Sequence, residues 1–135
     1  MTVDSATAKL TDEPISTKVA IEIADHLRGR STDDAKNILE AVLNKEQAIP
    51  FKRFKNGAGH QTGVGAGKYP QKASKSFLSV IRSVEHNAKD IGLAPDLKIT
   101  GLKANKGSTQ QSYGRHRGRQ NKRTHIDITV SEQEA

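Results

Sequence analysis

The feature that most constrains this 135-residue chain is a run of thirty residues, 97–126, that contains no Asp or Glu. Tyr113 is the only sizeable apolar side chain between residues 105 and 123, so this part cannot bury enough surface to fold against a core. Like charges repel one another, and a polyanion that releases counterions on binding relieves that repulsion. We therefore expect a nucleic-acid partner. The cations of the run are Lys98, Lys103, Lys106, Arg115, Arg117, Arg119, Lys122 and Arg123.

Positive charge is concentrated in the second half of the chain. The formal net charge is +7 overall, with +5 in residues 51–96 and +8 in residues 97–126. Charge alone does not separate RNA from DNA, an anionic lipid or an acidic protein. The absence of cysteine excludes disulfides and thiolate metal sites, and the five histidines show no paired ligand spacing. We expect neither a metal nor a cofactor.

The chain carries no sign of export or membrane insertion. Residues 1–14 are polar and lack the apolar core of a secretory signal, and no run approaches the roughly 20 apolar residues of a membrane span. We expect an intracellular, soluble protein without a membrane span. Its predicted parts are a polar N-terminal extension (1–14), a single domain (15–131) and an acidic tail (132–135).

Three segments have helical periodicity. The first helix is predicted to begin at Ser16 as N-cap and to end before Gly29. The second follows at once, because Ser31 and Asp34 have the spacing of a capping box. The third and longest runs from Pro70 to Gly92. The glycine-rich segment 55–69 between the second and third helices is predicted to be a loop.

After residue 96 the apolar period changes to two. Leu97 and Ile99 share one face, and a slip in phase at Gly101 suggests a bulge before the pattern resumes. The expected partner strand is 124–130. Strands that continue outward for ten residues per arm would reach roughly 30 Å past the core. The predicted fold is α+β, with three helices packed on a small antiparallel sheet and a long extended β-hairpin at about 103–123.

Enzymatic readings of the glycine-rich segment fail. A Walker loop needs Gly where Thr62 stands and Ser or Thr where Tyr69 stands, and a dinucleotide fingerprint needs Gly at Lys68. Side chains for nucleophilic catalysis do not cluster either, so we expect no enzyme. The second helix carries Asp33, Asp34 and Glu40 against Lys36 alone, which argues against a DNA-reading helix-turn-helix.

A second acid-free region covers residues 47–84. It mixes cations with Phe51, Phe54 and Tyr69, a combination suited to RNA, although the phenylalanines are equally explained by packing under the loop. In the hairpin, Arg115, Arg117 and Arg119 alternate with His116 and Gly118, so an extended backbone would place three guanidinium groups on one side. Guanidinium suits bidentate phosphate contacts and stacking on unpaired bases. A disordered basic tip is the alternative.

The order and spacing of several short motifs resemble those of the large-subunit ribosomal protein twenty-two family, in its archaeal and eukaryotic branch. The resemblance covers about residues 15–131, and the segment 50–70 suggests the branch. The motifs are Ser16-Thr17-Lys18, Leu27-Arg28-Gly29-Arg30, Ile49-Pro50-Phe51-Lys52-Arg53-Phe54, Gly67-Lys68-Tyr69-Pro70, Ala73, Asn87-Ala88, Ala104-Asn105-Lys106-Gly107, Arg117-Gly118-Arg119 and Thr124-His125-Ile126.

This resemblance implies a cytoplasmic structural protein of the large ribosomal subunit that aids assembly. Its body would bind large-subunit ribosomal RNA beside neighbouring ribosomal proteins, and its hairpin would line the polypeptide exit tunnel next to the nascent polypeptide. A free-standing basic regulator that binds DNA or a small RNA is the alternative. The residues expected to bind RNA are Lys18, Lys52, Arg53, Lys55, Lys68, Lys72, Lys75, Lys103, Lys106, Tyr113, Arg115, His116, Arg117, Arg119, Lys122 and Arg123.

Overall fold

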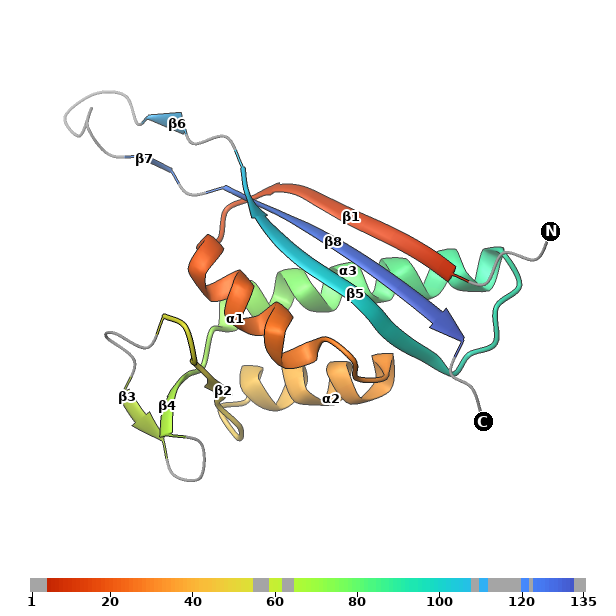
Figure 1. Cartoon of the computed structure of the whole chain (residues 1–135). Helices are drawn as coiled ribbons and strands as arrows, with labels where there is room; N and C mark the ends of the chain where they lie inside the picture. Colours follow the sequence, from red (N-terminus) through yellow and green to blue (C-terminus); the bar gives the residue numbers. More distant parts are fainter. Residues whose placement is uncertain are drawn as a thin grey trace.

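The computed structural model describes residues 5–54, 59–61, 65–107, 110–111, 120–121 and 123–132. Within them the chain has an α+β architecture, with three helices against an antiparallel three-stranded sheet (Figure 1), which confirms the predicted fold class. In chain order the elements are β1 (Ser5–Glu13), α1 (Thr17–Leu27), α2 (Thr32–Leu43), β2 (Ile49–Pro50), β3 (Gly59–Gln61), β4 (Gly65–Lys68), α3 (Gln71–Asp90), β5 (Leu97–Lys106), β6 (Gln110–Gln111), β7 (Gln120–Asn121) and β8 (Thr124–Glu132).

The main sheet has the order β1-β8-β5, with β8 in the centre. Strands β5 and β8 pair from Leu97 opposite Glu132 to Lys106 opposite Thr124. The register shifts between Ile99 and Gly101, so the predicted bulge is confirmed at its predicted place. The predicted partnership of these two strands is confirmed as well.

Strand β1 corrects the expectation that residues 1–14 form a polar extension. Residues 5–13 pair with β8 and form an edge of the main sheet. The buried side chains of β1 are Ala6 and Ala8. Alanine contributes little to an apolar pattern and is depleted in strands, so the alternation of residues 5–9 is a weak sequence signal. Pairing with β8 and packing against α3 determine this strand.

The helices begin where the sequence predicts. Ser16 and Ser31 are the N-caps of α1 and α2, and the Ser31 hydroxyl accepts a hydrogen bond of 3.2 Å from the backbone N–H of Asp34. Ser16 makes no side-chain cap bond. Just past α1, Gly29 has a φ of +87°, a conformation that L side chains rarely adopt. Pro70 directly precedes α3.

A small sheet of order β2-β4-β3 replaces the predicted glycine-rich loop. Pro50 lies opposite Gly67, and Gly59 also lies opposite Gly67 on the other side of β4. Glycine is normally depleted in strands, because it has no side chain to pack and loses much backbone entropy. Backbone pairing between distant segments therefore overrides local propensity here.

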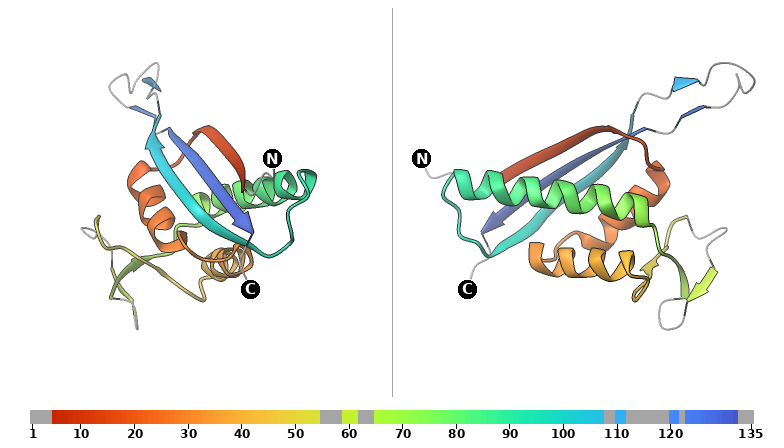
Figure 2. Two further views of the ribbon diagram at one scale, coloured as in Figure 1. Left: turned by 45° about the vertical axis from the view of Figure 1, so that its right-hand side comes forward. Right: turned by 180° about the vertical axis from the view of Figure 1, so that it is seen from behind.

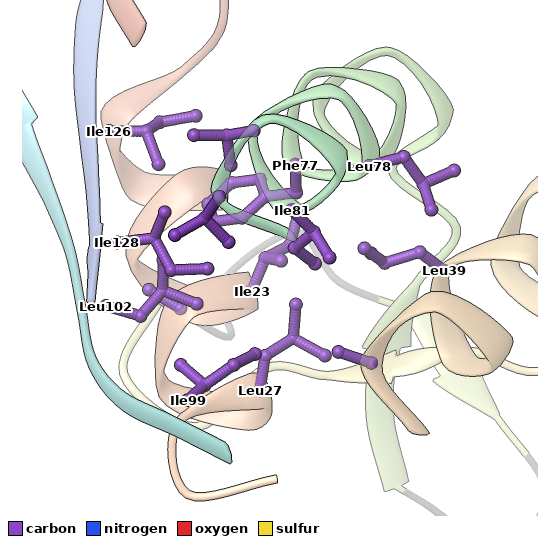
Figure 3. Close-up of a cluster of buried hydrophobic side chains, with 14 of the residues drawn as sticks. Ile23, Leu27, Leu39, Phe77, Leu78, Ile81, Ile99, Leu102, Ile126 and Ile128 are labelled. Atoms are coloured by element: carbon purple, nitrogen blue, oxygen red, sulfur yellow. The ribbon is translucent and has the colours of Figure 1, made fainter. Parts of the chain in front are cut away.

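The core lies between the main sheet and the helices. Helix α3 crosses the face of the sheet that is seen from behind, and α1 runs beside β5 (Figure 2). Ile23 and Leu27 of α1 meet Phe77 and Ile81 of α3 and the aliphatic side chains of β5 and β8 (Figure 3). No described helix is long and apolar enough to cross a membrane.

Candidate nucleic-acid interface

The hairpin leaves the body at one end of the main sheet. Beyond β5 and β8 the chain pairs again, with Gln110 opposite Asn121 and Gln111 opposite Gln120, and β6 and β7 lie past the end of the sheet (Figure 1). The strands therefore continue outward, as predicted. The candidate residues Tyr113, Arg115, His116, Arg117, Arg119 and Lys122 lie outside the described residues, as does Lys55, and stay predictions.

The base of the hairpin is held tightly. The N–H of Gly107 donates to the carbonyl of Arg123 at 2.8 Å, and a Cβ on Gly107 would lie 3.2 Å from the backbone of Arg123. The buried hydroxyl of Thr124 donates to the carbonyl of Ile15 at 2.8 Å and therefore accepts from Thr17 at 3.0 Å. Strand β8 is thus fastened to the start of α1 where the hairpin begins.

The turn after β2 carries two predicted RNA contacts, Lys52 and Arg53, whose position depends on a buried acid. Glu22 of α1 is 3% exposed. Its carboxylate accepts hydrogen bonds from the backbone N–H groups of Lys52 at 2.5 Å and of Arg53 at 3.0 Å. Both side chains point to solvent. Hydrogen bonds to an ionised acceptor are stronger than neutral ones, so Glu22 fixes this basic turn.

A second acid of α1 links two arginines. Asp25 lies 3.0 Å from Nη1 of Arg28 and 3.2 Å from Nε of Arg53. Arg28 also donates to the carbonyl of Leu102 in β5 at 2.6 Å. The sequence analysis did not select Arg28 as an RNA contact. Its position at the C-terminus of a helix, beside Gly29 and Arg30, was the available signal, because cations there complement the helix dipole.

The aromatic residues of the second acid-free region hold lysines. Phe51 is buried, which confirms the packing alternative for this residue, and Nζ of Lys68 lies 5.4 Å from the centre of its ring. Phe54 is half-buried, with Nζ of Lys18 at 5.8 Å from its ring centre. Cation–π contacts of this kind restrain a lysine without neutralising it. Tyr69 is half-buried as well.

The described candidate cations do not form one cluster. Arg53 and Lys103 line the same groove, whereas Lys72 and Lys75 lie one turn apart on α3. The described candidates with exposed side chains are Lys18, Lys52, Arg53, Lys68, Lys72, Lys75, Lys103 and Lys106, and Arg123 is half-buried. The exposed side chains of the first eight of these residues can meet a partner from solvent.

A histidine beside the basic turn has a lowered pKa. Burial lowers the pKa of His26, and the charges of Arg30 and Lys52 lower that pKa further. Its Nε2 is buried and has no hydrogen-bond partner among the described residues. His26 is therefore held neutral at the foot of the basic turn, and it adds no positive charge to the surface.

The fold defines the class of protein: an α+β body in which strands β5 and β8 continue into a hairpin beyond the main sheet. A family model for ribosomal protein L22p/L17e matches residues 8–131. Three archaeal proteins named large ribosomal subunit protein uL22 are similar to the chain. The one from Thermoplasma acidophilum is 40% identical over 133 residues (94% of this chain, 88% of that protein). The one from Cenarchaeum symbiosum is 37% identical over 133 residues (93% of this chain, 88% of that protein). The one from Archaeoglobus fulgidus is 42% identical over 104 residues (74% of this chain, 67% of that protein).

The chain belongs to the ribosomal protein L22p/L17e family. Membership makes it a structural constituent of the large ribosomal subunit, a cytoplasmic particle, and not an enzyme. The family resemblance and the branch named from the sequence motifs are confirmed by these matches.

Proposed function

We propose that this protein binds large-subunit ribosomal RNA through its body and its hairpin, aids assembly of the subunit, and lines the polypeptide exit tunnel with the hairpin. The observation that carries the proposal is the continuation of β5 and β8 into β6 and β7, beyond any part of the described body. The chain that continues there is acid-free from Leu97 to Ile126. An arm with this charge is stabilised by a surrounding polyanion.

The body supports the same proposal. The basic turn 52–53 and Lys103 of β5 present exposed cations beside the start of the hairpin, and Glu22 fixes the turn from below. Phosphate contacts of this kind position a protein on RNA without reading its sequence. Neighbouring ribosomal proteins and, at the hairpin, the nascent polypeptide are the further partners that we propose.

Binding at matched salt tests the RNA part. We expect higher affinity for large-subunit ribosomal RNA fragments than for mixed-sequence duplex DNA of equal length, and co-sedimentation with large subunits after a high-salt wash. Equal binding to both polymers, with loss from the subunits in the wash, would favour the free-standing regulator instead.

The hairpin is tested by the triple variant Arg115→Ala, Arg117→Ala, Arg119→Ala. If each guanidinium neutralises a phosphate, the slope of log affinity against log salt falls by about 0.9 per lost contact on a duplex and about 0.7 on a single strand. An unchanged slope would refute the phosphate role of these arginines.

A photo-crosslinking residue in place of Tyr113 tests the tunnel part. On ribosomes stalled with nascent chains of increasing length, we expect crosslinks to appear only above a minimum chain length, because the hairpin would meet the chain at one depth. A crosslinker in place of Lys89, on α3, is the control. Crosslinks at every length, or at neither position, would argue against a tunnel-lining hairpin.

A further inference from the structure

A groove of about 190 Å³ lies between α1 and β5, next to the start of the hairpin. It is open to solvent, and three separate parts of the chain contribute to it. Its polar and charged lining comes from Asp25 and Arg28 of α1, Arg53 of the turn after β2, and Lys103 and Asn105 of β5. The groove therefore brings together side chains that are far apart in the sequence.

The charge of this groove favours an anion. Arg28, Arg53 and Lys103 oppose the single carboxylate of Asp25. The Arg53 side chain is 64% exposed, and Lys103 forms no ion pair with any residue that the structure describes. An anion that enters thus meets cations whose donors are only partly used.

Two acids of α1 fix the orientation of Arg53. Glu22 and Asp25 are three positions apart and so lie on the same side of the helix. Glu22 accepts a hydrogen bond from the backbone N–H of Arg53, while Asp25 forms an ion pair with its guanidinium, with Oδ2 of Asp25 3.2 Å from Nε of Arg53. Since Asp25 lies at the Nε edge of the guanidinium, the two Nη groups at its other end can donate to an acceptor in the groove.

Arg28 closes the inner wall in a similar way. Its Nη1 is held by Asp25 and its Nη2 by the carbonyl of Leu102, which anchors it between α1 and β5. Arranging donors before the ligand arrives lowers the entropy lost on binding. The site is therefore preorganised rather than a chance meeting of flexible side chains.

We propose that this groove binds one backbone phosphate of the RNA, shared by Arg53 and Lys103, with Arg28 lending its charge from the inner wall. This inference rests on the proposed RNA-binding function and deepens it. The planar guanidinium matches the geometry of two phosphate oxygens, and the ammonium supplies a point charge opposite. The phosphate would join the basic turn to strand β5 and so fix the direction in which the hairpin leaves the body.

Sharing one phosphate gives a quantitative signature. We would measure the affinity of Arg53→Ala, Lys103→Ala and the double variant for a large-subunit ribosomal RNA fragment over a range of salt. If both side chains contact the same phosphate, the double variant loses about one unit of slope in total, whereas two separate contacts lose about two. Lys89→Ala removes an exposed charge from α3, outside the groove, and should leave the slope unchanged.

Asp25→Ala tests the positioning role with a sign that charge alone does not give. Removing an acid should tighten binding to a polyanion if only net charge matters. If Asp25 orients Arg53 and Arg28, binding weakens instead. The side chains of Arg53 and Lys103 are exposed, so unchanged thermal unfolding is expected of the variants at these two positions and shows that their fold is intact.

A direct measurement uses the ribodinucleotide UpU as a minimal phosphodiester. We expect its titration to shift the Nε–Hε NMR signal of Arg53 and the backbone signals of Lys103 and Asn105 together, with the dinucleoside lacking a phosphate as control. Four results would each overturn the shared-phosphate groove. The slope of log affinity against log salt could fall by two units in the double variant, or not fall at all. Asp25→Ala could bind RNA more tightly than wild type, or UpU could cause no NMR shift. If wild-type protein prefers ribosomal RNA over DNA while these results fail, only the groove is refuted; if that preference is absent, the proposed function itself fails.

Discussion

Oε1 of Glu22 lies 3.0 Å from the backbone nitrogen of Arg53, 31 positions further along the chain. The other oxygen of the same carboxylate accepts from the N–H of Lys52. A buried acid in the first helix thus fixes the backbone of the basic turn, and the placement of two cations depends on a residue of opposite charge. This relationship is the basis of the first prediction.

Replacement of Glu22 by Ala should lower the free energy of unfolding by about 2–3 kcal/mol, because two backbone donors lose a charged acceptor in a buried place. Glu22→Gln keeps one acceptor oxygen, so its free energy of unfolding should lie between those of wild type and Glu22→Ala. Urea denaturation measures both. Asp33→Ala, at an exposed acid of α2, serves as the control and should change stability little. If Glu22→Ala were as stable as wild type, the turn after β2 would not depend on its hydrogen bonds to Glu22.

Thr124→Val tests the fastening of the hairpin base. The hydroxyl of Thr124 is the donor to Ile15 and the acceptor from Thr17, and its removal leaves the Ile15 carbonyl unpaired at a buried site. We expect a loss of about 1–2 kcal/mol in unfolding free energy. Thr129→Val, on the same strand and half-buried, should cost less. Equal effects of the two substitutions would show that strand packing, not the hydrogen bond, sets the cost.

Gly107→Ala should strain the neck of the hairpin. The added Cβ would lie 3.2 Å from the carbonyl carbon and oxygen of Arg123. The backbone of Arg123 cannot move away without disturbing its hydrogen bond with the N–H of Gly107. We expect a destabilisation of about 1 kcal/mol, at the low end of overpacking effects, and displaced amide signals near Arg123. At Gly101 an added Cβ meets Thr129 at an ordinary 3.7 Å, so Gly101→Ala is the matched control. A Gly107→Ala protein as stable as Gly101→Ala would contradict a tight neck.

His26 makes stability depend on pH in a defined direction. Its folded pKa is lowered by burial and by the charges of Arg30 and Lys52, so the unfolded chain binds the proton more readily. The contribution of neutral His26 is therefore fully present above the unfolded pKa of about 6.5 and declines as pH falls below it. In the variant His26→Gln the loss of stability between pH 7 and pH 5 should be smaller than in wild type. Identical pH profiles of unfolding free energy would exclude His26 as the cause.

Much of the fold follows from local patterns in the sequence. The helix caps at Ser16 and Ser31, the end of α1 at Gly29, the bulge before Gly101 and the pairing of β5 with β8 were all predicted. Each depends on residues within a few positions of one another, or on a strong period-two pattern of large aliphatic side chains. Periodicity and capping residues therefore predict these elements without information on the tertiary structure.

Elements stabilised by distant partners were predicted wrongly or not at all. Strand β1 buries only alanines and owes its place to β8, and the glycine-rich β4 becomes a strand because β2 and β3 flank it. Phe51 was open between RNA stacking and packing until the core was seen to cover it.

The sequence by itself determined the class of fold and the positive charge of residues 97–126, because composition and short-range periodicity carry that information. Only the tertiary structure decided that Glu22 and Asp25 serve the basic surface and that Arg28, Arg53 and Lys103 meet in one groove. The physical reason is that a hydrogen bond or an ion pair between remote segments depends on how the chain packs in three dimensions, and no local spacing encodes that distance.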